Sequence, residues 1–169
     1  NVLINNAALQ IVSPIEEILL QDWQRSLNIN LTAPFLLSVK LLDELIATQG
    51  NIINISSIHA KLTKPNFTAY ATSKSGLSGL TKSLAVEIGN KVRVNSISPA
   101  AIDTQMLREG FTNIENGLEN LSNYHPSKSI GLSTDVVEAA LYLANGNKFV
   151  NGMEITLDGA ISSRLHDPQ

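Results

Sequence analysis

The predicted fold is decided by three runs of sequence: 51–56 (NIINIS), 68–88 (TAYATSKSGLSGLTKSLAVEI) and 92–98 (VRVNSIS). The outer two runs are short and rich in β-branched residues, which is typical of buried strands. In the middle run, Leu77, Leu80 and Leu84 recur at helical spacing and form one apolar face. A strand, a helix and a second strand in this order predict a right-handed βαβ unit with parallel strands.

Further strands and helices extend this unit in both directions along the chain. Strand-like runs occur at 2–5 and 154–157, and helical patterns occur at 21–48 and at about 134–144. This alternation predicts an α/β fold, a doubly wound (Rossmann-like) parallel sheet with helices on both faces. The sequence shows no internal repeat and no low-complexity linker, so we expect residues 1–169 to belong to a single domain.

The composition argues against several classes of function. The 169 residues are 43% hydrophobic and 16% charged, and the net charge is −3. This charge gives no electrostatic case for binding nucleic acid or an acidic membrane surface, and no run approaches the ~18 apolar residues that span a bilayer. The chain has no cysteine, which suits a cytoplasmic location. His59, His125 and His166 lack the spacing of metal ligands, so we expect no metal site.

Tyr70 and Lys74 stand one helical turn apart at the start of the middle run, and Ser57 precedes the tyrosine by thirteen residues. A phenol with an unperturbed pKa near ~10 is a poor acid–base group at neutral pH. An ammonium within ~4–6 Å favours the phenolate and lowers that pKa by roughly 1–3, and residues i and i+4 of a helix are neighbours. These side chains therefore indicate redox chemistry between a carbonyl and an alcohol.

A second pair with the same spacing, Tyr124 and Lys128, serves as an internal control. Pro126 stands between the two residues, where it resists a continuous helix. The surrounding segment, 113–133, is rich in Asn, Ser and Gly and has no sustained period. We therefore interpret the second pair as a coincidence.

Pro34 interrupts the helical pattern at 21–48. Because proline has no N–H, the carbonyl of Asn30, four residues earlier, loses its helical partner. The helix should kink there, and the freed carbonyl needs another donor, such as water. From the residues alone, a functional carbonyl and a simple bend of a long helix are equally compatible with this pattern.

The chain resembles the classical short-chain dehydrogenase/reductase family in five segments and in the end of its last predicted strand. The ordered combination is far more specific than any single match, and it covers nearly the whole chain. The matching segments are Asn5-Asn6-Ala7-Ala8, Asn30-Leu-Thr-Ala-Pro-Phe35, Asn54-Ile-Ser-Ser57, Tyr70-x-x-x-Lys74, Asn95-Ser-Ile-Ser-Pro99 with Ile102 and Thr104, and finally Asn151-Gly152 to Asp158-Gly159.

This resemblance implies a catalytic tetrad of Asn30, Ser57, Tyr70 and Lys74. Tyr70 would donate a proton to a carbonyl oxygen or remove it from an alcohol, and Ser57 would hydrogen-bond that oxygen. Lys74 would lower the pKa of Tyr70 and hold the hydroxyls of the nicotinamide ribose. Asn30 would hold, through its backbone carbonyl, a water that links Lys74 to solvent.

The resemblance also implies an NAD(P)-dependent oxidoreductase that acts on a small-molecule carbonyl or alcohol. NAD or NADP would supply the hydride chemistry; the residue that would select between them lies in a part of the family fold that this sequence does not show. Asn6 and Ala7 would line the cofactor near the adenosine ribose, and Ile102 would meet the carboxamide. The implied cofactor contacts are Asn6, Ala7, Tyr70, Lys74, Pro99, Ile102 and Thr104.

Two departures from the family pattern matter for function. No glycine-rich turn for the pyrophosphate appears, so we expect the chain to be part of a larger domain whose amino-terminal, phosphate-binding half is missing. Four positions at which the family commonly has glycine carry alanine, and a methyl is costly where φ must be positive. We expect Ala100 to matter most; the four positions are Ala8, Ala60, Ala100 and Ala160.

A protein without catalytic activity is the alternative to an enzyme. The missing phosphate loop favours a non-catalytic, degenerate family member that acts as a scaffold or partner subunit, whereas the intact tetrad opposes this alternative.

The resemblance also makes a prediction about assembly. The family pairs the helices predicted in 21–48 and 68–88 across a two-fold axis, so the resemblance implies a homodimer or homotetramer.

Overall fold

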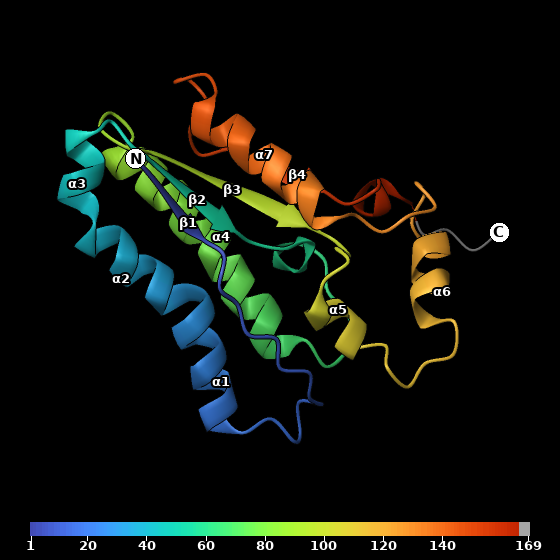
Figure 1. The fold of residues 1–169 in the computed structure, drawn as a ribbon. Helices are drawn as coiled ribbons and strands as arrows, with labels where there is room; N and C mark the ends of the chain where they lie inside the picture. Colours follow the sequence, from blue (N-terminus) through green and yellow to red (C-terminus); the bar gives the residue numbers. More distant parts are fainter. Residues whose placement is uncertain (166–169) are drawn as a thin grey trace.

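The computed structural model describes residues 1–165, and its centre is a four-stranded parallel sheet (Figure 1). The strands follow the spatial order β1-β2-β3-β4, and each neighbouring pair is parallel. The predicted parallel sheet is therefore confirmed. The strand bounds are β1 (Val2–Asn5), β2 (Asn51–Ile55), β3 (Arg93–Pro99) and β4 (Glu154–Leu157).

Helices cover both faces of the sheet, as a doubly wound fold requires. Ile52 and Ile53 of β2 are both fully buried, and they point to opposite faces because successive strand side chains alternate. Ile52 packs in a cluster with Leu45 and Ala85, whereas Ile53 packs with Leu143. The helices are α1 (Leu20–Leu27), α2 (Ala33–Lys40), α3 (Leu42–Ala47), α4 (Thr68–Ile88), α5 (Gln105–Glu109), α6 (Gly117–Tyr124) and α7 (Ser133–Asn145).

The pattern at 21–48 forms three helices and a π-helix instead of one long helix. The π-helix, Asn28–Thr32, joins α1 to α2, and the N–H of Ala33 after it donates to the carbonyl of Asn28, five residues back. Pro34 follows at once and has no N–H to donate, so a wider turn at this point accommodates the missing donor. Leu41, with φ −101° and ψ 11°, separates α2 from α3.

The bounds of the other predicted elements differ only slightly from the observed ones, but two short helices, α5 and α6, were not predicted. Strand β2 ends at Ile55, one residue before the predicted end, and β3 is shifted by one residue. Helix α6 lies in the segment predicted to lack a sustained period. It ends at Tyr124 because His125 is extended before Pro126, and a residue that precedes proline disfavours the helical region.

A chain of side-chain hydrogen bonds crosses the sheet beneath α4. The amide of Asn5 donates to Asn54 Oδ1 at 2.8 Å, and the amide of Asn54 donates to Thr81 Oγ1 at 2.9 Å. The hydroxyl of Thr81 donates in turn to the carbonyl of Leu77 at 2.9 Å. Asn5, Asn54 and Thr81 are all buried, so this polar chain ties β1, β2 and α4 together inside the protein.

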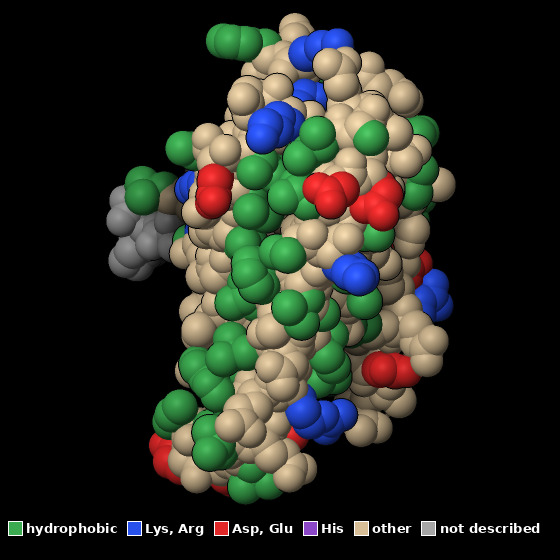
Figure 2. Space-filling model, turned by 90° about the vertical axis from the view of Figure 1, so that its left-hand side faces the viewer, with side chains coloured by type: hydrophobic (Ala, Val, Ile, Leu, Met, Phe, Trp, Pro, Cys, Tyr) green, Lys and Arg blue, Asp and Glu red, His purple; other side chains and the backbone are tan. Residues whose placement is uncertain are grey.

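Apolar side chains also lie exposed on the side formed by α1, α2 and α3. Leu20 of α1 and Leu36 of α2 are 71% and 57% exposed, and Val39 is 54% exposed. Figure 2 shows this side of the molecule, where hydrophobic side chains extend along much of its length. Within residues 1–165, no helix is both long and apolar enough to cross a membrane.

Of the four alanines that replace a family glycine, Ala160 is the strained one. Its φ is 67° and its ψ 16°, in the left-handed region, whereas Ala8, Ala60 and Ala100 do not have a positive φ. A side chain in the left-handed region costs roughly 1–2 kcal/mol. Ala100, which we expect to matter most because it follows Pro99 where the backbone would approach the nicotinamide, carries no such backbone strain.

Replacing Ala160 by glycine should stabilise the protein. We expect Ala160→Gly to raise the free energy of unfolding by roughly 0.5–1 kcal/mol, because relief of the strained φ exceeds the extra entropy of glycine in the unfolded chain. Urea unfolding measures the change. The matched control, Ala100→Gly, should lower stability by a similar amount, and a stability loss in both variants would contradict this account.

Candidate active site

The expected site residues gather where the parallel strands end. Asn6 and Ala7 follow β1, Ser57 follows β2, and Pro99 is the last residue of β3. In open parallel sheets ligands bind outside the carboxyl ends of the strands. The fold therefore presents these residues at the edge of the sheet that is suited to a ligand.

Ser57 is held at the end of β2 by a short 3₁₀ turn, Ile58–Ala60. Its Oγ accepts a hydrogen bond from the main-chain N–H of His59 at 3.2 Å. The hydroxyl of Ser57 also lies close enough to the Tyr70 phenol to lower the pKa of that phenol by hydrogen bonding. Because the N–H of His59 occupies one lone pair of Ser57, the hydroxyl hydrogen of Ser57 stays available for the group in front of it.

Tyr70 lies in the first turn of α4 and is 8% exposed. Burial raises the pKa of Tyr70 above its ordinary value of 10, and the hydrogen bond with Ser57 acts in the opposite direction. The ammonium of Lys74 lies 5.7 Å from the centroid of the Tyr70 ring. We expected Lys74 to lower this pKa, but the net shift is upward, because removal of the phenolate from water outweighs the opposing effect of Ser57.

Lys74 is a buried cation with one carbonyl partner. It is 2% exposed, and its Nζ donates to the carbonyl of Ile55 at 2.7 Å. Burial lowers the pKa of Lys74 to about 8. An ammonium has three donors, and among residues 1–165 only this one hydrogen bond engages them. The two remaining donors fit the hydroxyls of a ribose, so the residues present are compatible with a nicotinamide dinucleotide.

Asn30 lies in the π-helix and is completely buried. Its amide donates to the carbonyl of Leu9 at 2.8 Å and to Ser73 Oγ at 2.9 Å, and its Oδ1 accepts from the N–H of Leu9 at 2.8 Å. Ser73 donates in turn to the carbonyl of Tyr70 at 2.7 Å. The side chain of Asn30 therefore fastens the segment after β1 to α4, and it leaves the backbone carbonyl as the group for the predicted water.

The other expected cofactor residues lie in the segments that follow the strands, and none of them is hydrogen-bonded to Tyr70 within residues 1–165. Asn6 and Ala7 are exposed. Ile102 forms an isolated parallel bridge with Gly131. The hydroxyl of Thr104 caps α5 by accepting from the N–H of Leu107 at 3.3 Å, so this side chain has a structural role of its own.

Several residues that support the site were not recognised in the sequence. Ser73 links Asn30 to the backbone of Tyr70, and its position beside Lys74 was the available signal. Ser56 donates to the carbonyl of Lys74 at 3.2 Å. The ring contacts of His59 and Phe67 with Tyr70 cross an irregular loop, and no spacing rule could have shown them.

The second tyrosine–lysine pair does not form a comparable site. Tyr124 ends α6 and is 51% exposed, while Lys128 lies beyond Pro126 with a φ of 55°. The Nζ of Lys128 donates to the carbonyl of Asn123 at 2.8 Å. The two residues do not share a helix, as the intervening proline predicted.

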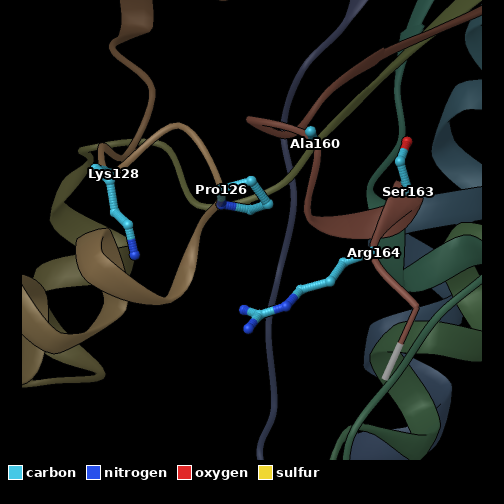
Figure 3. A pocket seen from close by; sticks show the side chains of 5 residues that line it. All are labelled: Pro126, Lys128, Ala160, Ser163 and Arg164. Carbon is cyan, nitrogen blue, oxygen red and sulfur yellow. The ribbon is translucent and has the colours of Figure 1, made fainter. Parts of the chain in front are cut away.

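One cavity is lined by residues of the carboxy-terminal part of the chain, and Tyr70 is not among them. It measures about 450 Å³, and Lys128 and Arg164 stand on opposite sides of it (Figure 3). A second cavity of about 250 Å³ lies near the ends of β3 and β4, where Ile102 and Asp158 are among its lining residues. Within residues 1–165, no group of three His, Cys, Asp or Glu side chains is placed to hold a metal ion; His166 lies outside the described residues.

The geometry therefore supplies a phenol for proton transfer, with a hydroxyl and an ammonium close to it. Ser57 is near enough to act on the pKa of Tyr70, Lys74 lies beside the ring of Tyr70, and Asn30 is joined to the same helix through Ser73. A buried phenol that keeps its proton at neutral pH is suited to protonating a developing alkoxide.

Comparisons with known proteins agree with this chemistry. A family model described as enoyl-(acyl carrier protein) reductase matches residues 1–162. The chain is 34% identical to 3beta-hydroxysteroid dehydrogenase 1 of Eggerthella lenta over 163 residues, 94% of this chain and 62% of that protein. It therefore spans less than two thirds of the length of this curated relative.

Solved structures share the fold. The aldohexose dehydrogenase of Thermoplasma acidophilum matches with a TM-score of 0.94 and 30% identity, over 99% of this chain and 70% of that one. A gluconate 5-dehydrogenase from Burkholderia cenocepacia, solved with NADP and tartrate, matches with a TM-score of 0.90 and 26% identity. That match covers 98% of this chain and 66% of the gluconate dehydrogenase.

The lowered pKa of Lys74 makes stability depend on pH. Between about pH 8 and 10.5 the folded protein holds fewer protons at Lys74 than the unfolded chain, so its stability should rise with pH in this window. We expect wild type to gain roughly 1 kcal/mol relative to Lys74→Met between pH 7 and pH 9. Urea unfolding of both proteins at both pH values tests this, and parallel pH dependences would contradict it.

Proposed function

Because this chain belongs to the short-chain dehydrogenase/reductase family, we propose that it carries the proton-transfer site of an NAD(P)-dependent oxidoreductase. The reaction is the interconversion of a carbonyl and an alcohol. The observation that supports this most directly is the grouping around Tyr70: the Ser57 hydroxyl acts to lower the pKa of the phenol, and the buried ammonium of Lys74 lies 5.7 Å from the centroid of the Tyr70 ring.

Tyr70 is the general acid in reduction and the general base in oxidation. In reduction its phenol gives a proton to the carbonyl oxygen, so that a new O–H bond forms as the C=O double bond becomes single. The hydroxyl of Ser57 donates a hydrogen bond to the same oxygen and stabilises the negative charge that develops there. When bound, the nicotinamide supplies the hydride in reduction or accepts it in oxidation.

Lys74 and Asn30 assist Tyr70 in the proposed reaction. The two donors of Lys74 that Ile55 does not use hold the hydroxyls of the nicotinamide ribose. The backbone carbonyl of Asn30 lacks its usual helical donor, because Pro34 has no N–H. This carbonyl holds a water between Lys74 and solvent. This water returns a proton to Tyr70 after each reduction. Asn6, Ala7, Pro99, Ile102 and Thr104 complete the proposed cofactor contacts.

The substrate is a small carbonyl or alcohol compound, and the cofactor is NAD or NADP. The names of three similar proteins refer to a hydroxysteroid, an aldohexose and gluconate, which have different carbon skeletons, so the names do not narrow the skeleton of the proposed substrate. The chain has no cysteine, which suits a reaction in the reducing cytoplasm.

The exposed apolar face supports a homodimer or homotetramer. This face includes Leu20, Leu36 and Val39 on α1 and α2, and contiguous exposed apolar surface marks interaction sites. On α4, a Cβ built at Gly79 would meet no atom within 4 Å, so a second copy could approach closely there. Figure 2 shows how far the apolar surface extends.

A charge placed on this face should weaken the assembly. We expect Leu36→Glu to lower the mass measured by light scattering, because association would bury an unpaired carboxylate. Leu165→Glu, at an 82% exposed position outside α1 and α2, should leave the mass unchanged. A wild-type protein that stays monomeric at high concentration would refute the assembly.

The catalytic role of Tyr70 is tested by removing its hydroxyl. We expect Tyr70→Phe to lower turnover by about 10²–10⁴-fold while cofactor binding stays largely intact, because only the proton donor is lost. Since the pKa of Tyr70 is raised, reduction should persist to alkaline pH, whereas oxidation should accelerate as pH rises and the phenolate forms. Nicotinamide absorbance follows both directions across the pH range.

Matched variants separate this role from general damage. Lys74→Ala should impair both turnover and cofactor binding, and Lys74→Arg should restore little because a planar guanidinium does not replace a compact ammonium. Tyr124→Phe, in the second pair, should leave proton transfer unaffected. If Tyr70→Phe keeps near-normal turnover, the catalytic assignment is wrong and a scaffold role replaces it.

A further inference from the structure

A stack of two rings lies against the edge of Tyr70. The imidazole of His59 lies parallel to the ring of Phe67, with a centroid distance of 4.6 Å and an angle of 5°. Both rings stand nearly perpendicular to Tyr70, at centroid distances of 5.7 Å for His59 and 6.3 Å for Phe67. Lys64 Nζ lies 4.7 Å from the centroid of Phe67. His59 is thus placed beside the phenol that transfers the proton.

The turn that carries His59 is fixed on several sides. The main-chain N–H of His59 donates to Ser57 Oγ at 3.2 Å, and the carbonyl of Ala60 accepts a hydrogen bond from the hydroxyl of Ser75 in α4 at 2.9 Å. Lys61 pairs with the carboxylate of Glu154 in β4 at 3.3 Å. An imidazole on a turn with these tethers keeps its position relative to Ser57 and Tyr70, which is a property that a substrate-binding group needs.

One nitrogen of the ring is engaged and the other is not. Nδ1 of His59 lies 3.2 Å from Thr63 Oγ1, whereas Nε2 has no hydrogen-bond partner among residues 1–165. Burial and the nearby charge of Lys64 lower the pKa of His59 to about 4. The ring is therefore neutral at physiological pH, and Nε2 is a donor or an acceptor according to the tautomer.

We propose that His59 binds the substrate through Nε2, by a hydrogen bond to a hydroxyl on the carbon next to the reacting carbon. A hydroxyl both donates and accepts, so it can pair with either tautomer of a neutral imidazole. His59 follows the oxygen-binding Ser57 by two residues and contacts the ring of Tyr70, so a group it binds lies next to the reacting oxygen. The favoured substrates are α-hydroxy ketones and, in the reverse direction, vicinal diols. This inference rests on the proposed function.

The kinetic test compares one substrate pair in wild type and in His59→Phe. The probes are 2-hydroxycyclohexanone and cyclohexanone, reduced with NADH or NADPH. Phenylalanine keeps a flat ring for the stack on Phe67 but has no Nε2. We expect KM for the hydroxy ketone to rise about 5-fold, as loss of one neutral hydrogen bond predicts, with kcat changed little and cyclohexanone unaffected. An equal effect on both ketones would overturn the proposal.

A second measurement does not depend on turnover or on the variant folding. In wild-type protein with ¹⁵N-labelled histidine, 2-hydroxycyclohexanone should shift the Nε2 resonance of His59, and cyclohexanone should not. His125 is an internal control, because it is buried and its Nδ1 faces the carbonyl of Leu121 at 2.8 Å. No shift at His59, or the same shift with both ketones, would also overturn the proposal.

The two measurements distinguish failure here from failure of the proposed function. If Tyr70→Phe abolishes turnover but His59→Phe does not discriminate between the ketones, the oxidoreductase assignment stands and the role of His59 is wrong. If neither ketone is reduced, the oxidoreductase assignment loses its support, and the ¹⁵N shift alone decides whether His59 binds a hydroxyl.

Discussion

The hydrogen bond from the ammonium of Lys74 to the carbonyl of Ile55 is the interaction on which the site depends. It joins the second turn of α4 to the last residue of β2, and it does so in the protein interior. A charge removed from water is costly unless it is well paired, so the helix cannot slide along the strand without exposing the ammonium to a worse environment. Ser57 lies two residues beyond this anchor and Tyr70 one turn before it, and their contact follows from the anchor.

Much of the fold could be predicted because its determinants are local. The bounds of α4 follow from its regular apolar spacing, and the four strands follow from their β-branched runs between turn residues. The helix interruption at Pro34 was also predictable, since the lost donor is a property of proline. The sequence did not predict that a π-helix would form there, because a kink and a wider turn both accommodate one missing N–H. Helix α6 was missed because its residues carry no clear period.

The chemistry of the site was predictable in kind but not in detail. The spacing of Tyr70 and Lys74 predicted that the two side chains would lie together, since residues four apart on a helix are neighbours; the role of Tyr70 as proton donor stays a proposal. The direction of the Tyr70 pKa shift was wrong, because the depth of burial is a property of the tertiary structure. The same holds for Ala160, whose positive φ is set by the turn after β4. The stack of His59 on Phe67 depends on how an irregular loop folds back, and no sequence period encodes it.

The hydrogen-bonded chain from Asn5 through Asn54 to Thr81 has a consequence for how the protein melts. A strand held only by its backbone hydrogen bonds can separate from the sheet by itself, at little cost to the rest of the molecule. Here, detachment of β1 takes the amide of Asn5 away from Asn54 Oδ1, and Asn54 is completely buried. An acceptor left without its donor in the interior carries a full desolvation penalty. Strands β1 and β2 and helix α4 therefore open together, and amide hydrogens in all three should exchange with solvent at a common rate set by one cooperative event.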